Sequence, residues 1–286
     1  MEWDDFKEQI NYLNRNYNIL SFQELSYIIK SGDNVPKNSV VLTFDDGYRD
    51  HFDVYRFLKK MNISGVFFPV ASVLESRTIL DVNKIHFILN SVPNHALLID
   101  EIHLYLRNAY KDEFISIKEE LQRNFMSPNR WDVAKVNYIK RVLQVGLPHL
   151  ERVEVCDILF KKYVSRDLVD FSNELYLGID DIIEMSNEGM EIGSHGYSHN
   201  WLNSMSMTDQ ELDIDLSLVY LRSLGLCQSQ FLFCYPYGAY NEDTLNVLRE
   251  KGCDGAFTCI PEKHNLSEHN ILEIRRFDTN DITYNT

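Results

Sequence analysis

The stretch from Val40 to Tyr48, Val-Val-Leu-Thr-Phe-Asp-Asp-Gly-Tyr, constrains the fold more than any other part of the chain. Its apolar, β-branched beginning is too short for a helix and fits a buried strand of a parallel sheet. Asp45 and Asp46 would then emerge at the carboxyl end of that strand, where α/β folds hold their active sites. A plain Asp-Asp-Gly turn that only ends the strand is the alternative. Because successive strand residues point to opposite sides, one carboxylate could bind a metal while the other acts as a base.

Strand and helix patterns alternate on either side of a long middle segment. Short buried strands are predicted at 65–70, 190–194, 231–235, 255–259 and 271–277. Helices are expected around 6–13, 22–31, 50–61, 179–186 and 242–251, and in a segment through Leu212, Leu216, Val219 and Leu224. Strand, helix, strand units give parallel pairing with right-handed crossovers, so the predicted fold class is α/β.

The middle segment, from about Thr78 to Phe171, has long amphipathic stretches, many charges and no clear strand. Its helix-like parts are 85–89, 102–110, 114–125, 131–145 and 153–163. We assign 78–174 to a helical insertion, which could cover the active site, form a contact in a homo-oligomer, or do neither.

Composition and charge narrow the classes of function. The chain of 286 residues is long enough for one large α/β domain, and its formal net charge of −15 argues against nucleic acid or an anionic membrane as the main partner. Five cysteines without a close Cys-x-x-Cys pair favour reduced, mostly buried thiols.

The first residues do not resemble a signal peptide, and no later run is long enough to cross a bilayer. We therefore expect a cytoplasmic protein without membrane insertion, unless the chain lacks its natural amino terminus.

Two histidines, His195 and His199, lie in the run Ser-His-Gly-Tyr-Ser-His-Asn at 194–200, directly after a predicted strand. At this spacing both imidazoles can bind one metal, on the first turn of a helix or in a compact loop. His-x-x-x-His alone is often coincidental, but its position after a strand matches that of Asp46. Two imidazoles and one carboxylate leave open positions on a metal for the water that hydrolysis needs.

A third strand end carries Tyr-Pro-Tyr-Gly at 235–238. A rigid corner of this kind could aim a backbone N–H into the site, where a fixed donor stabilises an oxyanion. An ordinary rigid turn is the alternative.

In their order along the chain, Thr-Phe-Asp-Asp-Gly at 43–47, His-Gly-Tyr-Ser-His at 195–199 and Tyr-Pro-Tyr-Gly at 235–238 closely resemble three motifs of one enzyme family. These are the first three motifs of the polysaccharide deacetylases, the NodB-homology or carbohydrate esterase family 4 enzymes. The resemblance covers about residues 1–75 and 175–286. It implies a distorted (β/α) barrel of about seven strands, formed by 1–77 and 175–286 with 78–174 inserted. It also implies a divalent metal, usually zinc, with cobalt, nickel or iron as alternatives.

The resemblance also implies roles for individual residues. Asp46, His195 and His199 would be the metal ligands. Asp45 would be the general base for the attacking water, and the backbone N–H of Tyr237 would help to hold the oxyanion.

The chain departs from the family pattern at two points. The family commonly takes the acid that protonates the departing amine from a late Leu-x-His motif, which is missing near the end of this chain. The acid therefore stays open between His264 and protonated Asp45. Cys234 stands where many members carry an arginine that orients the base. Arg276, or less favourably Arg275, could supply that charge, although an ordinary surface ion pair is the alternative for both.

The motifs and the resemblance together predict a metal-dependent hydrolase that removes an N-acetyl or similar N-acyl group from an amino sugar. A cytoplasmic enzyme would meet a nucleotide-linked or lipid-linked sugar, or an oligosaccharide precursor of a surface glycan, more readily than finished cell wall. Hydrolysis of another small amide is a second possibility. The alternative from a different class is a catalytically weak carbohydrate-binding or scaffold protein that keeps the metal for structure.

Overall fold

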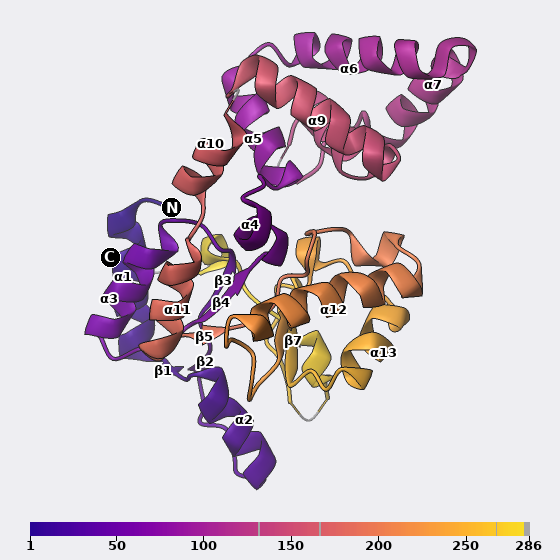
Figure 1. Cartoon of the computed structure of the whole chain (residues 1–286). Coiled ribbons are helices and arrows are strands. Elements are labelled where there is room, and N and C mark those ends of the chain that lie inside the picture. The colour runs from indigo at the N-terminus through magenta and orange to yellow at the C-terminus, as the bar shows by residue number, and fades with distance from the viewer. Residues whose placement is uncertain (131, 166, 267, 283–286) are drawn as a thin grey trace. The chain divides into compact units, whose positions relative to one another are not determined.

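The structure of the chain is a computed structural model that describes residues 1–130, 132–165, 167–266 and 268–282. The chain divides into two compact units (Figure 1). Unit 1 comprises Met1–Arg77 and Asn173–Thr286, and unit 2 comprises Thr78–Ser172. Among the described residues, the strands all belong to unit 1, whereas unit 2 is helical.

Unit 1 is built on short strands that pair in parallel. They are β1 (Asn18–Ile19), β2 (Ser39–Val40), β3 (Thr43–Asp46), β4 (Val66–Pro69), β5 (Glu191–Ile192), β6 (Leu232–Cys234) and β7 (Gly255–Phe257). They form three small sheets with the orders β1-β2, β3-β4-β5 and β6-β7. Single parallel bridges link Ser194 to Phe233 of β6 and Phe257 of β7 to Ile274, so the row of neighbouring strands continues beyond β5. The α/β class is therefore confirmed, and within the part of the chain that the structure describes the sheets are small and not closed.

Helices connect these strands in unit 1. They are α1 (Trp3–Asn16), α2 (Phe22–Ser31), α3 (His51–Lys60), α4 (Ala71–Ser76), α11 (Ile179–Asn187), α12 (Met207–Ser223) and α13 (Glu242–Glu250). Short 3₁₀ turns lie at Leu202–Ser204, Pro236–Gly238, Ile271–Glu273 and Thr279–Asp281. Local sequence determines both ends of α2. Ser21 and Glu24 form a reciprocal capping box at its start, and Gly32 ends it in the left-handed conformation.

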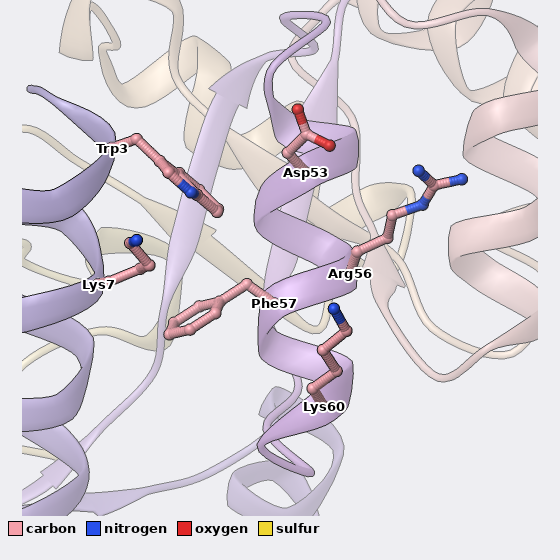
Figure 2. Close-up of a pocket in the computed structure, with 6 residues that line it drawn as sticks. All are labelled: Trp3, Lys7, Asp53, Arg56, Phe57 and Lys60. Atoms are coloured by element: carbon pink, nitrogen blue, oxygen red, sulfur yellow. The ribbon is translucent and has the colours of Figure 1, made fainter.

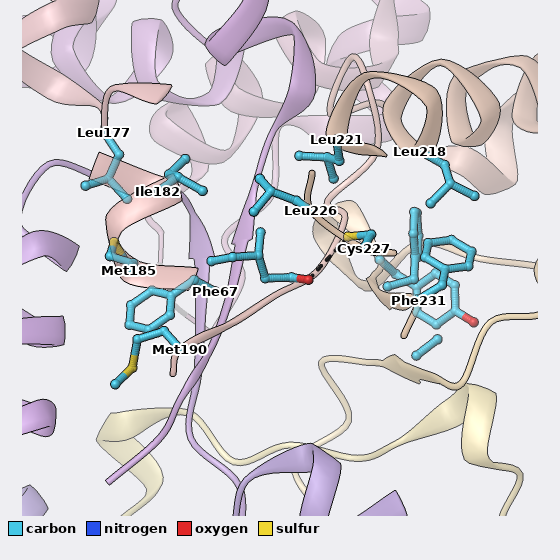
Figure 3. Packing of buried hydrophobic residues seen from close by; sticks show 14 of the residues in the cluster. Phe67, Leu177, Ile182, Met185, Met190, Leu218, Leu221, Leu226, Cys227 and Phe231 are labelled. Atoms are coloured by element: carbon cyan, nitrogen blue, oxygen red, sulfur yellow. Dashed lines mark hydrogen bonds between the residues drawn. The ribbon is translucent and has the colours of Figure 1, made fainter. Parts of the chain in front are cut away.

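The strands β4, β6 and β7 are buried on both faces, as their continuous apolar runs predict. Phe67 of β4 packs in one cluster with residues such as Ile182 and Met185 of α11 and Leu221 of α12 (Figure 3). Its neighbours along β4, Val66 and Phe68, point to the other side of the strand and belong to a second cluster. Because each such side chain contributes about 1.5–3 kcal/mol when fully buried, the two clusters hold the strand ends in place.

The predicted final strand at 271–277 is wrong. Residues Ile271–Glu273 form a 3₁₀ turn, which the side chain of Asn270 caps by accepting a hydrogen bond from the backbone N–H of Leu272. Only Ile274 bridges to β7 among the described residues. The alternating apolar pattern arises because Leu272 and Ile274 are both buried, not because the segment is extended throughout.

The helix expected through Leu212, Leu216 and Val219 forms as α12, but this apolar row faces solvent. The three side chains are 56%, 42% and 67% exposed, while Asp213 and Ser217 of the same helix are buried. The Ser217 hydroxyl lies 2.6 Å from that of Ser194 and shares a hydrogen bond with it. Asp213 and Ser217 lie on the inner face of α12, beside apolar residues such as Ile214, because they bind the segment that carries the two histidines.

Unit 2 consists of helices with their own buried contacts. They are α5 (Asp81–Ser91), α6 (His95–Tyr110), α7 (Phe114–Phe125), α8 (Ala134–Arg141) and α9 (His149–Tyr163), with a 3₁₀ turn at Lys111–Glu113 and a π-helical turn at Val142–Gly146. α10 (Leu168–Leu175) spans the point in the sequence where unit 2 ends. The helix expected at 131–145 begins at Ala134, and residue 131 lies outside the described residues. No helix in the described ranges is both long and apolar enough to cross a bilayer.

Candidate active site

Asp45 and Asp46 lie at the carboxyl end of β3, as predicted. Within the sheet they pair with Phe68 and Pro69 of β4. The chain turns sharply after them, because Asp46 and Gly47 both have left-handed backbones with φ of 71° and 73°. A Cβ on Gly47 would lie 3.1 Å from the Cβ of Pro69. Both the backbone conformation and the close approach of Pro69 therefore favour glycine at this position.

The imidazoles of His195 and His199 both lie close to the carboxylate of Asp46. The Nε2 atoms of the two imidazoles lie 3.4 Å and 3.3 Å from Oδ1 of Asp46. This oxygen is buried and has no hydrogen-bond partner in the described structure. Tetrahedral zinc with bonds of about 2.1 Å places its ligands at about this separation from one another. Burial alone would raise the pKa of Asp46, but the two imidazoles hold it well below its usual range. The donor set therefore fits a divalent cation.

A hydrogen bond at the ring nitrogen that does not face Asp46 fixes the orientation of His195. Its Nδ1 donates a hydrogen bond of 2.8 Å to the backbone carbonyl of Cys234, since a carbonyl can only accept. The other ring nitrogen, Nε2, is therefore directed at Asp46. Such a hydrogen bond sets the tautomer that leaves Nε2 available to a metal.

A buried carboxylate from α12 holds the loop between the two histidines. Asp213, only 5% exposed, accepts hydrogen bonds from the backbone N–H groups of Tyr197 and Ser198 at 2.9 Å and 3.0 Å. A Cβ on Gly196, whose φ is +74°, would lie 2.8 Å from Oδ2 of Asp213. The loop then ends in a left-handed residue, His199, with φ of 54°. Asp213 was not among the predicted site residues, because it follows Leu212 in a helix whose apolar residues gave no reason to expect a buried carboxylate.

Arg276 binds Asp45 through both guanidinium nitrogens. Nη1 and Nη2 each donate to a different carboxylate oxygen at 2.8 Å. The guanidinium is itself held, because Nε donates to the carbonyl of Thr258 at 2.8 Å and Nη1 to the hydroxyl of Thr43 at 3.2 Å. Burial would raise the pKa of Asp45, but the positive charge of Arg276 lowers it below its usual value. Arg275, by contrast, pairs with Glu262, which is exposed.

Cys234 adds a weak contact to the same carboxylate. Its thiol donates to Oδ2 of Asp45 at 3.4 Å. The residue at the position where many family members carry arginine thus contacts the predicted base, while the charge beside that base comes from Arg276 at the far end of the sequence.

Tyr237 forms part of an aromatic group beside His199. It lies in the 3₁₀ turn Pro236–Gly238 but has a left-handed backbone, with φ of 59°. Its ring centroid is 4.7 Å from that of His199, and on Trp201 it stacks at 4.7 Å with an interplanar angle of 17°. Trp201 was not among the predicted site residues, and its only signal is its position two residues after His199.

His264 is not brought to this group of residues by any described contact. Its ring lies 5.2 Å from that of His269, and both of its nitrogens are buried without a hydrogen-bond partner in the described structure. Burial, followed by the positive charges of His269 and Arg275, lowers its pKa.

A separate surface groove of about 550 Å³ lies between α1 and α3 (Figure 2). It is lined by Trp3, Lys7, Asp53, Arg56, Phe57 and Lys60. None of these side chains belongs to the three motifs. The groove is therefore not the candidate active site.

Comparison with a family model agrees with the arrangement of the motifs. The model for polysaccharide deacetylases matches residues 32–124 and 163–256. The chain belongs to the polysaccharide deacetylase family. The two matched segments contain the Asp-Asp corner, the His195 to His199 loop and the Tyr237 corner, and they also extend into unit 2. Among curated proteins, no sequence matches the chain.

Solved structures of deacetylases share this fold. The deacetylase PplD of Streptococcus pyogenes, solved in complex with acetate, has a TM-score of 0.57 and 16% identity, over 96% of this chain and 79% of that one. IcaB of Ammonifex degensii has a TM-score of 0.57 and 16% identity, over 97% and 84% of the two chains. The BpsB deacetylase domain of Bordetella bronchiseptica has a TM-score of 0.54 and 16% identity, over 96% and 83%. At these identities the similarity establishes the fold alone.

Proposed function

We propose that this member of the polysaccharide deacetylase family is a metal-dependent hydrolase. It would remove an N-acetyl or similar N-acyl group from an amino sugar in a glycan or glycan precursor. One observation carries the proposal: an Asp-His-His donor set with two buried imidazoles lies beside a second carboxylate that an arginine binds through both terminal nitrogens. The family assignment supports glycan deacetylation as the class of reaction.

Asp46, His195 and His199 would hold the metal. Two imidazoles and one carboxylate suit zinc, with cobalt, nickel or iron as alternatives. When bound there, a divalent metal polarises the acyl carbonyl and lowers the pKa of water towards neutrality. The hydrogen bond from His195 to the carbonyl of Cys234 would keep this imidazole in the required orientation.

Asp45 would act as the general base. Arg276 keeps this carboxylate ionised at neutral pH, so it can accept a proton from the attacking water as the new carbon–oxygen bond forms. The backbone N–H of Tyr237 would stabilise the negative charge that develops on the acyl oxygen. When the carbon–nitrogen bond breaks, protonated Asp45 would return the proton to the departing amine, which makes a contribution from His264 unnecessary.

We also propose that the strands belong to a distorted (β/α) barrel that residues 1–77 and 175–286 form, with 78–174 as an insertion. The parallel row from β3 through β7 to Ile274 supports this arrangement. At one end of the row Arg276, two residues after Ile274, reaches back to Thr43 and Asp45 of β3 through side-chain hydrogen bonds.

Acetate release tests the proposed function. The protein is stripped of metal, reloaded with zinc or cobalt, and incubated with free, oligomeric, nucleotide-linked and lipid-linked N-acetylamino sugars. Release that requires the metal would support the proposal, and the substrate that reacts would identify the sugar class. If one metal binds tightly per chain but no substrate is hydrolysed, the function is wrong and the carbohydrate-binding or scaffold alternative gains support.

A further inference from the structure

We propose that Trp201 is a positioning residue that holds Tyr237 against His199 and thereby fixes the backbone of the Tyr237 corner. The proposal rests on the proposed function, because it concerns the backbone N–H that would stabilise the oxyanion. It assigns a role to a side chain that lies outside the three motifs.

The rings of these residues are packed in sequence. Trp201 stacks nearly parallel on Tyr237, with ring centroids 4.7 Å apart and an angle of 17° between the planes. Tyr237 contacts His199 at 4.7 Å, and His199 in turn lies 4.9 Å from His195. The rings come from two loops, one after β5 and one after β6. Trp201 and His199 lie on the same loop, and Tyr237 lies on the other.

The backbone on both sides of this contact is unfavourable for residues with a side chain. His199 and Tyr237 have φ of 54° and 59°, in the left-handed region that glycine normally occupies. Such conformations persist at functional sites only when the surrounding structure holds them. The rings of the two left-handed residues contact each other, and Trp201 stacks on the Tyr237 ring of this pair. The φ and ψ angles of Tyr237 set the directions of the peptide groups on either side of it. A Tyr237 ring that is held less firmly would therefore let these angles change, and the direction of the Tyr237 N–H with them.

Trp201 can therefore affect the reaction without contacting the substrate. A misplacement of a catalytic group by about 1 Å can lower a rate by about 100-fold. An aromatic pair contributes a smaller amount, which corresponds to a rate effect of about three- to tenfold. We expect this effect in kcat, with KM little changed, because the contact orients a group that acts on the developing charge and not on the bound sugar.

The experiment compares three variants of the metal-loaded protein with the unaltered protein in acetate release. Trp201→Phe keeps a ring that can stack on Tyr237 and is expected to retain most of kcat. Trp201→Leu keeps much of the apolar volume but has no ring, and Trp201→Ala has neither. Both are expected to lower kcat about three- to tenfold. Unchanged kcat in the Leu and Ala variants, or a loss equal in Phe, Leu and Ala, would overturn the proposal.

A double-mutant cycle then tests whether Trp201 acts through Tyr237. Tyr237→Ala removes the ring but keeps the backbone N–H. In this background Trp201→Ala should cause no further loss of kcat. If the loss is as large as in the unaltered background, or appears in KM alone, Trp201 acts by another route and the proposal is wrong.

Thermal unfolding of the same cycle separates this proposal from the proposed function. If no variant hydrolyses any substrate, the proposed function fails, but the stack can still be measured. The cycle should then show a favourable coupling between Trp201 and Tyr237 in the free energy of unfolding. Additive effects of the two substitutions would overturn the positioning role whether or not the protein is a deacetylase.

Discussion

The candidate site has two halves that the chain builds differently. We call them the base half, around the proposed base Asp45, and the metal half, around the proposed ligand Asp46. The two carboxylates are neighbours in sequence at the end of β3. Asp45 is bound by a guanidinium through both oxygens, whereas Oδ1 of Asp46 is buried without a hydrogen-bond partner and faces two imidazoles. In the proposed function the partners, and not the residue type, would divide the tasks between these identical side chains.

The two halves also differ in how they are supported. In the base half, Arg276 is tied to the backbone of Thr258 and to Thr43, both at or beside strand ends. In the metal half, His199 lies on a loop that depends on Asp213 for the position of its backbone. Substitutions in the base half should therefore change turnover, and those in the metal half should change metal affinity.

The largest effect is expected from Asp46→Asn, which removes a charged ligand from the metal half. Because loss of a partner that only supports a ligand already costs about 10- to 100-fold in affinity, loss of the ligand itself should weaken metal binding by more than about 100-fold. Turnover should fall with metal content. Metal analysis after dialysis, together with acetate release, checks this prediction. Full metal content in the variant would show that Asp46 is not a ligand.

Arg276→Lys tests the base half. Lysine cannot reproduce the paired hydrogen bonds, so kcat should fall about 10- to 100-fold while metal content stays unchanged. Arg276 lowers the pKa of Asp45 against the effect of burial. A weaker partner should therefore raise that pKa. Because the base must be ionised, the acidic limb of the pH–rate profile should move to higher pH.

Arg275→Lys is the matched control for this prediction. It changes the adjacent residue, which pairs with the exposed Glu262. The control should leave the rate and the pH profile unchanged. Equal effects of the two lysine variants would contradict the assignment of Arg276 to the base half.

Asp213→Asn tests how far the metal half depends on the loop that carries His199. The carboxylate accepts two backbone hydrogen bonds from the loop, and the amide would place an NH₂ group where one acceptor is needed. Metal affinity should fall about tenfold. Competition with a chelator measures it, with Asp215→Asn as the control, because Asp215 lies on the same helix but pairs with Lys251. A normal affinity in Asp213→Asn would show that the loop does not depend on this carboxylate.

The smallest expected effect is on stability. Gly196 and Gly225 both have positive φ, so alanine at either position should cost about 1 kcal/mol in the free energy of unfolding. Only at Gly196 would the new Cβ also overlap Asp213, whereas nothing lies within 4 Å at Gly225. Denaturant unfolding should therefore show a larger loss for Gly196→Ala than for Gly225→Ala. Equal losses would mean that the loop adapts without cost.

The elements that the sequence predicted well depend on local patterns. The strand ends at Asp46 and Cys234 follow from apolar runs that are cut off by turn residues, and the structure places a strand before each. The three motifs meet because parallel strands end at one edge. Arg276 was also a candidate, but only as one of two arginines, since sequence cannot show which of them reaches Asp45.

The parts that the sequence missed depend on contacts between distant segments. Leu212, Leu216 and Val219 of α12 were expected as an apolar row, but they are exposed. The polar residues on the opposite face of the helix were not predicted to have a role. Asp213 is inside because the loop at 197–198 needs an acceptor, which the periodicity of one helix cannot reveal. The strand expected at 271–277 failed because a cap at Asn270 favours a 3₁₀ turn over an extended chain.

The most direct test of the account is Asp45→Asn, with metal content and acetate release measured on the same sample. The division between the two halves predicts that the variant keeps its metal, since Asp46, His195 and His199 are intact. It also predicts a loss of turnover of more than about 100-fold, because asparagine cannot accept the proton. Loss of the metal together with activity, or turnover close to that of the unaltered protein, would contradict the assignment of Asp45 as the base.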